Sequence, residues 1–297
     1  MPDSIDLDAL RAFARVAELG SLARAATALE VAQSGVSRRI ATLEAALGGR
    51  LFHRTGRGVT PTALGARLLP RARAVLAELD ALAEDARGES ASPSGTVDLG
   101  LVPAVSRPLV AALTRRLRRE APRIRLRALE AYSGQIEEWL ADGRIDIGLF
   151  NRYRRGAVRG AELFLESDIV LVRAGRAGKL ADMPFRALAG VPLVLPPRPN
   201  SLVTAVLDLA ARHQVKIDLA LEAGSPALIR DAVERAGLAT LIPQHLAARE
   251  YAGGFTAARI VKPALHQRTW LMLTTRRPAT LAARAVGRIL RELAPTP

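Results

Sequence analysis

The chain has 297 residues, enough for about two domains, and its 43 Lys and Arg against 29 Asp and Glu give a formal net charge of +14. It contains no cysteine, which excludes disulfides, thiolate zinc sites and a cysteine nucleophile. We find neither a basic start followed by an apolar run nor a long apolar stretch, so we expect no signal peptide, no membrane span and a cytoplasmic protein.

Three short helices are predicted at the start of the chain, over residues 6–19, 21–29 and 33–47. In the third, the apolar residues recur at spacings of four, three and four and form one buried stripe: Val36, Ile40, Leu43 and Leu47. Polar residues occupy its other face. Only residues 30–32 separate it from the second helix, the connection length of a helix-turn-helix. An ordinary αα-hairpin with a solvated polar face has the same spacing.

A basic segment follows the third helix. Between residues 33 and 73 there are eight arginines and one acid, Glu44, a local net charge of +7, whereas residues 1–90 as a whole carry only +1. Gly56 and Gly58 suit the turn of a β-hairpin wing. Such a patch binds phosphates of any sequence and leaves base choice to the helix. The predicted DNA contacts are Gln33, Ser34, Ser37, Arg38, Arg39, Arg54 and Arg57.

A longer helix is predicted over residues 62 to about 88, and the segment from Arg87 to Gly95 is rich in Ser, Pro and Gly, as linkers are. The apolar residues of this helix alternate at spacings of four and three, which is the pattern of a coiled-coil seam that would join two chains. The alternative is a helix that packs on its own domain. The predicted seam residues are Leu68, Ala72, Val75, Leu79 and Leu82.

Strands and helices alternate after the linker, which predicts an α/β fold with mainly parallel strands. Four strand-to-helix corners carry a serine, at residues 102–106, 131–134, 198–201 and 223–226. Each serine can be a simple N-cap, but together the corners favour a small anionic ligand, such as a carboxylate, at the carboxyl ends of the strands. The predicted ligand contacts are Ser106, Ser133, Gly134, Asn151, Arg198, Ser201, Gly224 and Ser225.

Catalysis is the rival class of function, and the sequence gives it no support. The four histidines have no metal-ligand spacing, and we find no nucleophile elbow and no phosphate-binding glycine loop. We therefore expect no catalytic residue, no metal and no cofactor. A solute-binding protein would share the α/β part but would not explain residues 1–60.

Several ordered motifs near the start resemble those of LysR-type transcriptional regulators: Leu10-Arg11-Ala12-Phe13, Ala25-Ala26, Val31-Ala32-Gln33-Ser34-Gly35-Val36-Ser37-Arg38, Leu51-Phe52-His53-Arg54 and Thr62-Ala63-Leu64-Gly65. One residue departs from the pattern. The family usually has Ser where this chain has Ala32, so the third helix lacks its side-chain cap, at a cost of about 1 kcal/mol. Residues 130–146 also resemble the branch around the nitrogen assimilation control regulator.

The resemblance implies a winged helix-turn-helix in residues 1–61, a linker and dimerisation helix in 62–90, and a two-lobed effector domain in 91–297, similar to a periplasmic binding protein. Lobe I would comprise about 95–163 and 268–297, and lobe II about 164–267, with crossing strands near 164–172 and 268–275. We predict a dimeric or tetrameric regulator that binds double-stranded promoter DNA and a small effector, with RNA polymerase as a further candidate partner. A regulator without a ligand is the alternative.

Overall fold

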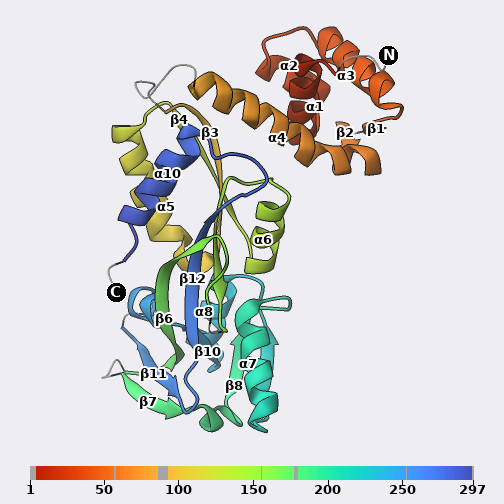
Figure 1. Ribbon diagram of the computed structural model, residues 1–297. Helices are drawn as coiled ribbons and strands as arrows, with labels where there is room; N and C mark the ends of the chain where they lie inside the picture. Colours follow the sequence, from red (N-terminus) through yellow and green to blue (C-terminus); the bar gives the residue numbers. More distant parts are fainter. Residues whose placement is uncertain are drawn as a thin grey trace. The chain divides into compact units, whose positions relative to one another are not determined.

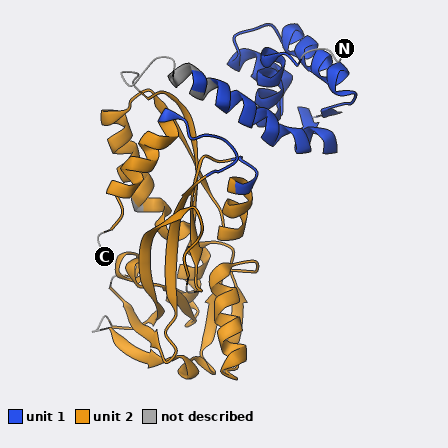
Figure 2. Ribbon diagram, in the orientation of Figure 1, with its two compact units in different colours: residues 1–92, 141–144, 274–281 blue, residues 93–140, 145–273, 282–297 orange. Residues whose placement is uncertain are grey.

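The computed structural model describes residues 5–56, 58–85, 93–154, 156–176, 180–251 and 253–295 (Figure 1). The chain divides into two compact units, one of residues 1–92, 141–144 and 274–281 and one of residues 93–140, 145–273 and 282–297 (Figure 2). A helical N-terminal part with a small hairpin and a C-terminal α/β part confirm the predicted fold class. The predicted DNA contact Arg57 lies outside the described residues.

The first unit begins with a helix-turn-helix and a hairpin. Its elements are α1 (Leu7–Leu19), α2 (Leu22–Ala28), α3 (Gln33–Leu47), β1 (Phe52–Thr55), β2 (Gly58–Pro61) and α4 (Ala63–Asp85). The side chains of Asp6 and Ser21 cap α1 and α2, each accepting a hydrogen bond from a backbone N–H of the first turn. Ala32 precedes α3 and gives it no side-chain hydrogen bond, which confirms the missing cap.

The apolar faces of these helices meet in one core. Val36, Ile40 and Leu43 of α3 are buried together with Phe13 of α1. The hairpin is held against the end of α1, where the Val59 N–H donates to the Gly20 carbonyl at 2.9 Å. At this contact a Cβ on residue 58 would lie 2.3 Å from that carbonyl oxygen, and the φ of 140° is also one that only glycine adopts readily.

The second unit contains a ten-stranded sheet in which we distinguish two parts. The part that we call lobe I has the strand order β4-β3-β5-β12-β6, where β3, β4 and β5 are parallel and β12 is antiparallel to both of its neighbours. Its elements are β3 (Gly95–Leu101), α5 (Pro103–Glu120), β4 (Ile124–Glu130), α6 (Ser133–Ala141), β5 (Ile147–Arg152), β6 (Ala161–Ala174), β12 (His266–Leu273) and α10 (Leu281–Glu292).

Helix α6 packs very closely on the lobe I sheet. A Cβ on Gly148 of β5 would lie 2.7 Å from Leu140 and 2.8 Å from Ile136, the two buried apolar residues of α6. A larger residue at this position would push the helix off the sheet or force the strand to move. The absence of a side chain at Gly148 therefore sets the distance between α6 and the sheet. It also sets the position of Ser133 at the start of α6.

The other part, which we call lobe II, continues the sheet in the order β6-β10-β8-β9, with β11 paired to β6 and β7 paired to β11. Its elements are β7 (Ala181–Pro184), the 3-10 helix η1 (Phe185–Leu188), β8 (Pro192–Leu195), α7 (Ser201–Arg212), β9 (Asp218–Glu222), α8 (Pro226–Arg235), β10 (Ala239–Pro243), α9 (Gln244–Glu250) and β11 (Phe255–Val261). Two apolar clusters, one with α7 and one with α8, fill the space between sheet and helices.

Strand β6 crosses between the lobes. It pairs with β12 as far as Asp168 and with β10 and β11 from Ile169 onward, which falls inside the range 164–172 predicted for the first crossing. The second predicted crossing, at residues 268–275, is misplaced. Residues 268–273 of β12 are hydrogen-bonded to β5 within lobe I, so the chain re-enters lobe I earlier, through residues 262–265.

Candidate DNA-reading head and effector pocket

The start of α3 presents polar side chains to solvent. Gln33, Ser34 and Arg38 are exposed and Ser37 is half-buried. They share the first two turns, and the apolar residues of the same helix face the core. This arrangement suits insertion into a major groove, where the first turns of a recognition helix reach the base edges.

Arg39 has a different environment from Arg38. Its guanidinium lies 3.2 Å from the carboxylate of Asp8 in α1, and the side chain is half-buried. The pair is partly exposed, so its contribution to stability is small, but it turns Arg39 toward α1. The two neighbouring arginines, which the sequence analysis grouped together, thus differ: Arg39 pairs with Asp8, and Arg38 is exposed.

Glu44 has a structural role that the sequence analysis did not identify. It is buried, with 9% exposure, although it is a carboxylate. One oxygen accepts the Leu51 N–H at 2.7 Å and the other lies 3.2 Å from Arg50. Glu44 therefore ties the end of α3 to the start of the wing. The wing arginine Arg54, on β1, is exposed.

The predicted seam of α4 divides into two parts. Ala72 is buried, with 5% exposure, and packs with Leu68 against the core of the head. This is the packing that the alternative interpretation expected for the first part of the helix. Val75 and Leu82 are 47% and 66% exposed, and Leu79 is half-buried. The surface open to a second chain therefore comprises the later seam residues.

A pocket of about 470 Å³ lies between α6, the loop after β5, and α7. It brings together two of the four predicted corners, those that carry Ser133 and Ser201. It is lined by Ser133, Gly134, Glu137, Arg152, Tyr153, Arg154, Gly156, Ala157, Val158, Pro199, Asn200, Ser201, Thr204, Ala205 and Asp208. Three of the eight predicted ligand contacts are in this set.

The hydroxyl groups of the two pocket serines face each other. Ser133 is buried and its Oγ accepts the Asn151 N–H at 3.0 Å, so the hydroxyl proton points elsewhere. The Ser201 Oγ lies 3.4 Å from the Ser133 Oγ, at the limit of hydrogen-bond distance. The N-terminal amides of α7 are taken by Asn200, whose side chain accepts from Leu202 and Val203, which leaves the Ser201 hydroxyl free of the capping role.

A chain of buried hydrogen bonds supports the pocket from behind. Burial raises the pKa of Tyr153, so its phenol keeps its proton and donates to the Gln267 Oε1 at 3.0 Å. The Gln267 amide lies 3.3 Å from the Thr269 hydroxyl, which donates to the Asn151 Oδ1 at 2.8 Å. Tyr153, Gln267 and Thr269 thus each donate to the next side chain of the network, which fixes the side chains that it links. It holds Asn151 behind the wall rather than in the pocket.

Two ion pairs lie in the pocket wall. Arg152 lies 2.5 Å from Glu137 of α6, and Arg154 lies 3.4 Å from Asp208 of α7. Burial raises the pKa of Glu137, and the charge of Arg152 opposes this rise. These four charged residues were not predicted. Glu137 follows Ser133 by one helical turn and Asp208 follows Ser201 by two, so helical spacing from each serine would have found both acids.

The remaining predicted ligand contacts do not line this pocket. Ser106 lies inside α5 and is 2.5 Å from the carboxylate of Glu130, and Ser225 caps α8. The Gly224 carbonyl accepts from Tyr132 at 3.5 Å, and Arg198 is exposed.

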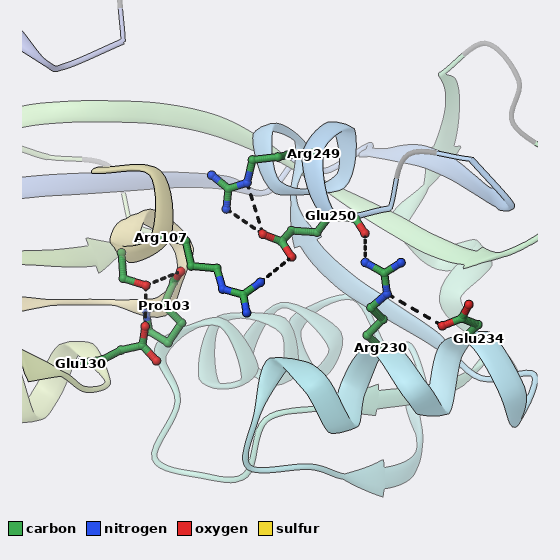
Figure 3. A network of polar contacts seen from close by, with 8 residues as sticks. Pro103, Arg107, Glu130, Arg230, Glu234, Arg249 and Glu250 are labelled. Atoms are coloured by element: carbon green, nitrogen blue, oxygen red, sulfur yellow. Dashed lines mark hydrogen bonds and ion pairs between the residues drawn. The ribbon is translucent and has the colours of Figure 1, made fainter. Parts of the chain in front are cut away.

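Figure 3 shows the polar network beside the start of α5. Arg107 of α5 reaches Glu250 at the end of α9, with 3.4 Å between the guanidinium and the carboxylate. Arg249 pairs with the same carboxylate at 2.9 Å, and Arg230 of α8 donates to the Glu250 carbonyl. Glu250 therefore joins lobe I to two helices of lobe II.

Among the described residues, no group of His, Asp or Glu side chains is arranged to hold a metal ion, and no helix there is long and apolar enough to cross a membrane.

Comparisons with known proteins agree with this architecture. Residues 7–66 match the family described as bacterial regulatory helix-turn-helix protein, lysR family, and residues 90–295 match the LysR substrate binding domain. The chain is 30% identical to a probable hydrogen peroxide-inducible genes activator of Mycobacterium leprae, with 97% of this chain and 94% of the relative covered. It is 27% identical to the nitrogen assimilation regulatory protein nac of Klebsiella aerogenes, with 99% and 96% covered.

Solved structures show the same fold. A full-length OxyR variant from Pseudomonas aeruginosa superimposes with a TM-score of 0.78 at 18% identity, covering 97% of this chain and 98% of that one. CbnR in complex with its target DNA superimposes with a TM-score of 0.62 at 21% identity, covering 98% and 100%. The chain thus belongs to the LysR family of transcriptional regulators, with an N-terminal DNA-binding helix-turn-helix domain and a C-terminal effector-binding domain.

Proposed function

We propose that α3 reads promoter DNA through Gln33, Ser34, Ser37 and Arg38, while Arg54 of the wing contacts phosphates. The observation that carries this assignment is the group of exposed polar side chains in the first two turns of α3, opposite a buried apolar stripe. We assign the same phosphate-binding role to Arg57 from its sequence position. Arg39, which pairs with Asp8, supports the packing of α3 on α1.

The matched variants Arg38→Ala and Arg39→Ala test this reading face. Arg38→Ala is expected to weaken binding to the operator by about 1–3 kcal/mol, because a base-contacting arginine is lost. Arg39→Ala is expected to have a smaller effect. The readout is the affinity for operator and for unrelated DNA across a series of salt concentrations. Equal losses for the two variants, or no loss for Arg38→Ala and Ser34→Ala, would show that the face is assigned wrongly.

For the effector domain we propose a small carboxylate ligand at Ser133 and Ser201. What supports it is the pair of hydroxyls 3.4 Å apart at the pocket surface, one of which has its lone pair engaged by the Asn151 N–H. Two donors at this separation can each serve one oxygen of a carboxylate. Gly134, beside Ser133 in the pocket lining, lets the ligand approach the first turn of α6.

Thermal shift measurements with butyrate test the carboxylate site. Butyrate is expected to raise the melting temperature of the wild-type chain by ligand linkage, and Ser133→Ala and Ser201→Ala should each reduce that rise. Ser225→Ala is the matched control, because that serine caps α8 outside the pocket. Full stabilisation of both pocket variants would place the carboxylate elsewhere, and no stabilisation of any form would favour a regulator without such a ligand.

Regulation requires the ligand to bind two quaternary states with different affinity. We propose a homodimer or homotetramer whose linker helices meet through the exposed part of α4, around Val75 and Leu82. A two-fold dimer would place two α3 helices about one DNA turn apart. Because the Mycobacterium leprae relative is named an activator, our proposal includes RNA polymerase as a partner, at a cytoplasmic promoter.

The names of the relatives do not identify the signal. One is a peroxide-inducible activator and another a nitrogen regulator. This chain cannot sense peroxide by thiol oxidation, because it has no cysteine. Its only sulfur-containing side chains are those of three methionines. This favours a reversibly bound effector over redox chemistry at a thiol.

A further inference from the structure

The Arg152–Glu137 pair in the pocket wall carries an inference about which anions the pocket accepts. We propose that the effector has a second carboxylate, that this group displaces Glu137 from Arg152, and that Glu137 takes up one proton as it is displaced. The ligand class is therefore a short dicarboxylate, and its binding is coupled to protonation of the protein. The inference rests on the proposed function of the pocket as the effector site.

The spacing of the groups fits such a ligand. Ser133 and Glu137 both lie on α6 and both line the pocket, four residues apart, which is about 6 Å along a helix axis. Arg152 reaches the same region from the end of β5 and lies 2.5 Å from Glu137. A dicarboxylate whose first carboxylate is held by Ser133 and Ser201 can extend along α6 and bring its second carboxylate to Arg152.

The ligand's second group is expected to be an anion and not a cation, because Glu137 can become neutral when it is displaced and Arg152 cannot. A ligand cation would have to displace Arg152, and a guanidinium cannot lose its proton to avoid being left unpaired. A ligand anion displaces Glu137, which can become neutral. Its half-buried position already raises its pKa, and loss of the nearby Arg152 charge raises the pKa further. Once protonated, Glu137 is also a hydrogen-bond donor to the bound carboxylate.

The other charged groups around the pocket do not offer the same exchange as readily. Asp208 faces the pocket from α7, but its partner Arg154 is 84% exposed and the two are 3.4 Å apart, so water already screens that pair. Tyr153 keeps its proton, since burial raises its pKa. Among the described residues, no histidine or lysine lines the pocket. Glu137 is thus the group through which a proton would be taken up.

The pH dependence has a definite sign. At pH values between the pKa of Glu137 in the free protein and its higher pKa in the complex, each bound ligand brings in a proton, so affinity rises as pH falls, by up to about tenfold per pH unit. Below the lower of these two pKa values the dependence flattens. A monocarboxylate that occupies only the two serines needs no such exchange, and its affinity is expected to change little over the same range.

The test compares succinate with butyrate, which has the same number of carbons, by calorimetric titration of the full chain between about pH 6 and pH 8. Succinate is expected to bind more tightly than butyrate and increasingly so toward the acid end. Titration in two buffers of different ionisation enthalpy should show uptake of up to one proton per succinate. Malonate, glutarate and adipate complete the set, so that a different ligand length is not mistaken for failure.

Glu137→Gln mimics the protonated side chain, so it is expected to bind succinate tightly at all these pH values with no proton uptake. Arg152→Gln should lose the preference for succinate over butyrate. Glu138→Gln is the matched control, because Glu138 is the next residue of α6, is exposed and does not line the pocket. It should behave as the wild type does.

Three outcomes would overturn the inference: no dicarboxylate of the set binds more tightly than butyrate, the wild type binds without proton uptake, or Glu137→Gln keeps the wild-type pH dependence. These outcomes leave the proposed function intact if butyrate still binds in a manner that depends on Ser133 and Ser201. Loss of all carboxylate binding would instead remove the effector site itself, while DNA binding by the head is measured separately.

Discussion

The buried carboxylate of Glu44 offers the sharpest stability prediction. In Glu44→Ala the Leu51 N–H loses its 2.7 Å acceptor in a buried environment, and a buried hydrogen bond to a charged group is worth about 1.5–3 kcal/mol. The ion pair with Arg50 adds at most about 1 kcal/mol, because that arginine is 83% exposed. We therefore expect Glu44→Ala to destabilise the head by about 2–4 kcal/mol. Glu44→Gln, which keeps an acceptor for Leu51, should cost about 1 kcal/mol or less.

Hydrogen exchange of the full chain measures this effect where it arises. Peptides that include Leu51 and the wing should exchange much faster in Glu44→Ala, while the effector domain exchanges as in the wild type. Glu78→Ala, at an exposed glutamate of α4, controls for the loss of a helical carboxylate. The reasoning fails if Glu44→Ala protects the Leu51 amide as well as Glu78→Ala does, or if Glu44→Gln is as damaging as Glu44→Ala.

Three further predictions concern packing, capping and association. Gly148→Ala should destabilise the effector domain by about 1–3 kcal/mol in thermal unfolding, because its Cβ would collide with Leu140; a neutral result would mean that α6 shifts freely. Ser225→Ala should lower stability by about 1 kcal/mol through loss of the α8 cap, and an unchanged melting temperature would contradict that role. Val75→Glu combined with Leu82→Glu should raise the dimer dissociation constant in sedimentation; wild-type association would place the interface elsewhere.

Features that depend on local spacing could be predicted from the sequence. The bounds of α3 were predicted to the residue because the buried stripe has a helical period and Gly48 ends the helix in a left-handed conformation. The missing cap at Ala32 followed from one residue type at one position. The wing was predicted from its glycines, since a tight hairpin turn needs backbone angles that other residues adopt at a cost.

Features that depend on distant contacts could not be predicted. Glu44 looked like a surface glutamate in a helix, and only the return of the chain at Leu51 makes it a buried acceptor. Strand β5 continues past Asn151 to Arg152, an arginine of the pocket that the sequence analysis did not consider. The serine of the first corner was grouped with the others, but Glu130 on the adjacent strand satisfies it.

The polar contacts between the two lobes are weak enough for a weakly bound ligand to change how the lobes are held together. Polar contacts across the pocket region are long: Ser133 to Ser201 is 3.4 Å, Tyr132 to the Gly224 carbonyl is 3.5 Å, and Arg154 to Asp208 is 3.4 Å. Hydrogen bonds at the upper limit of the distance range contribute little. The network behind the pocket is stronger, with Thr269 2.8 Å from Asn151. A carboxylate bound at Ser133 and Ser201 would replace their weak mutual hydrogen bond with charge-assisted ones. Little binding free energy would be lost in breaking the original contact. If the proposed function holds, even a weakly bound carboxylate would supply the difference in affinity between two states that regulation requires.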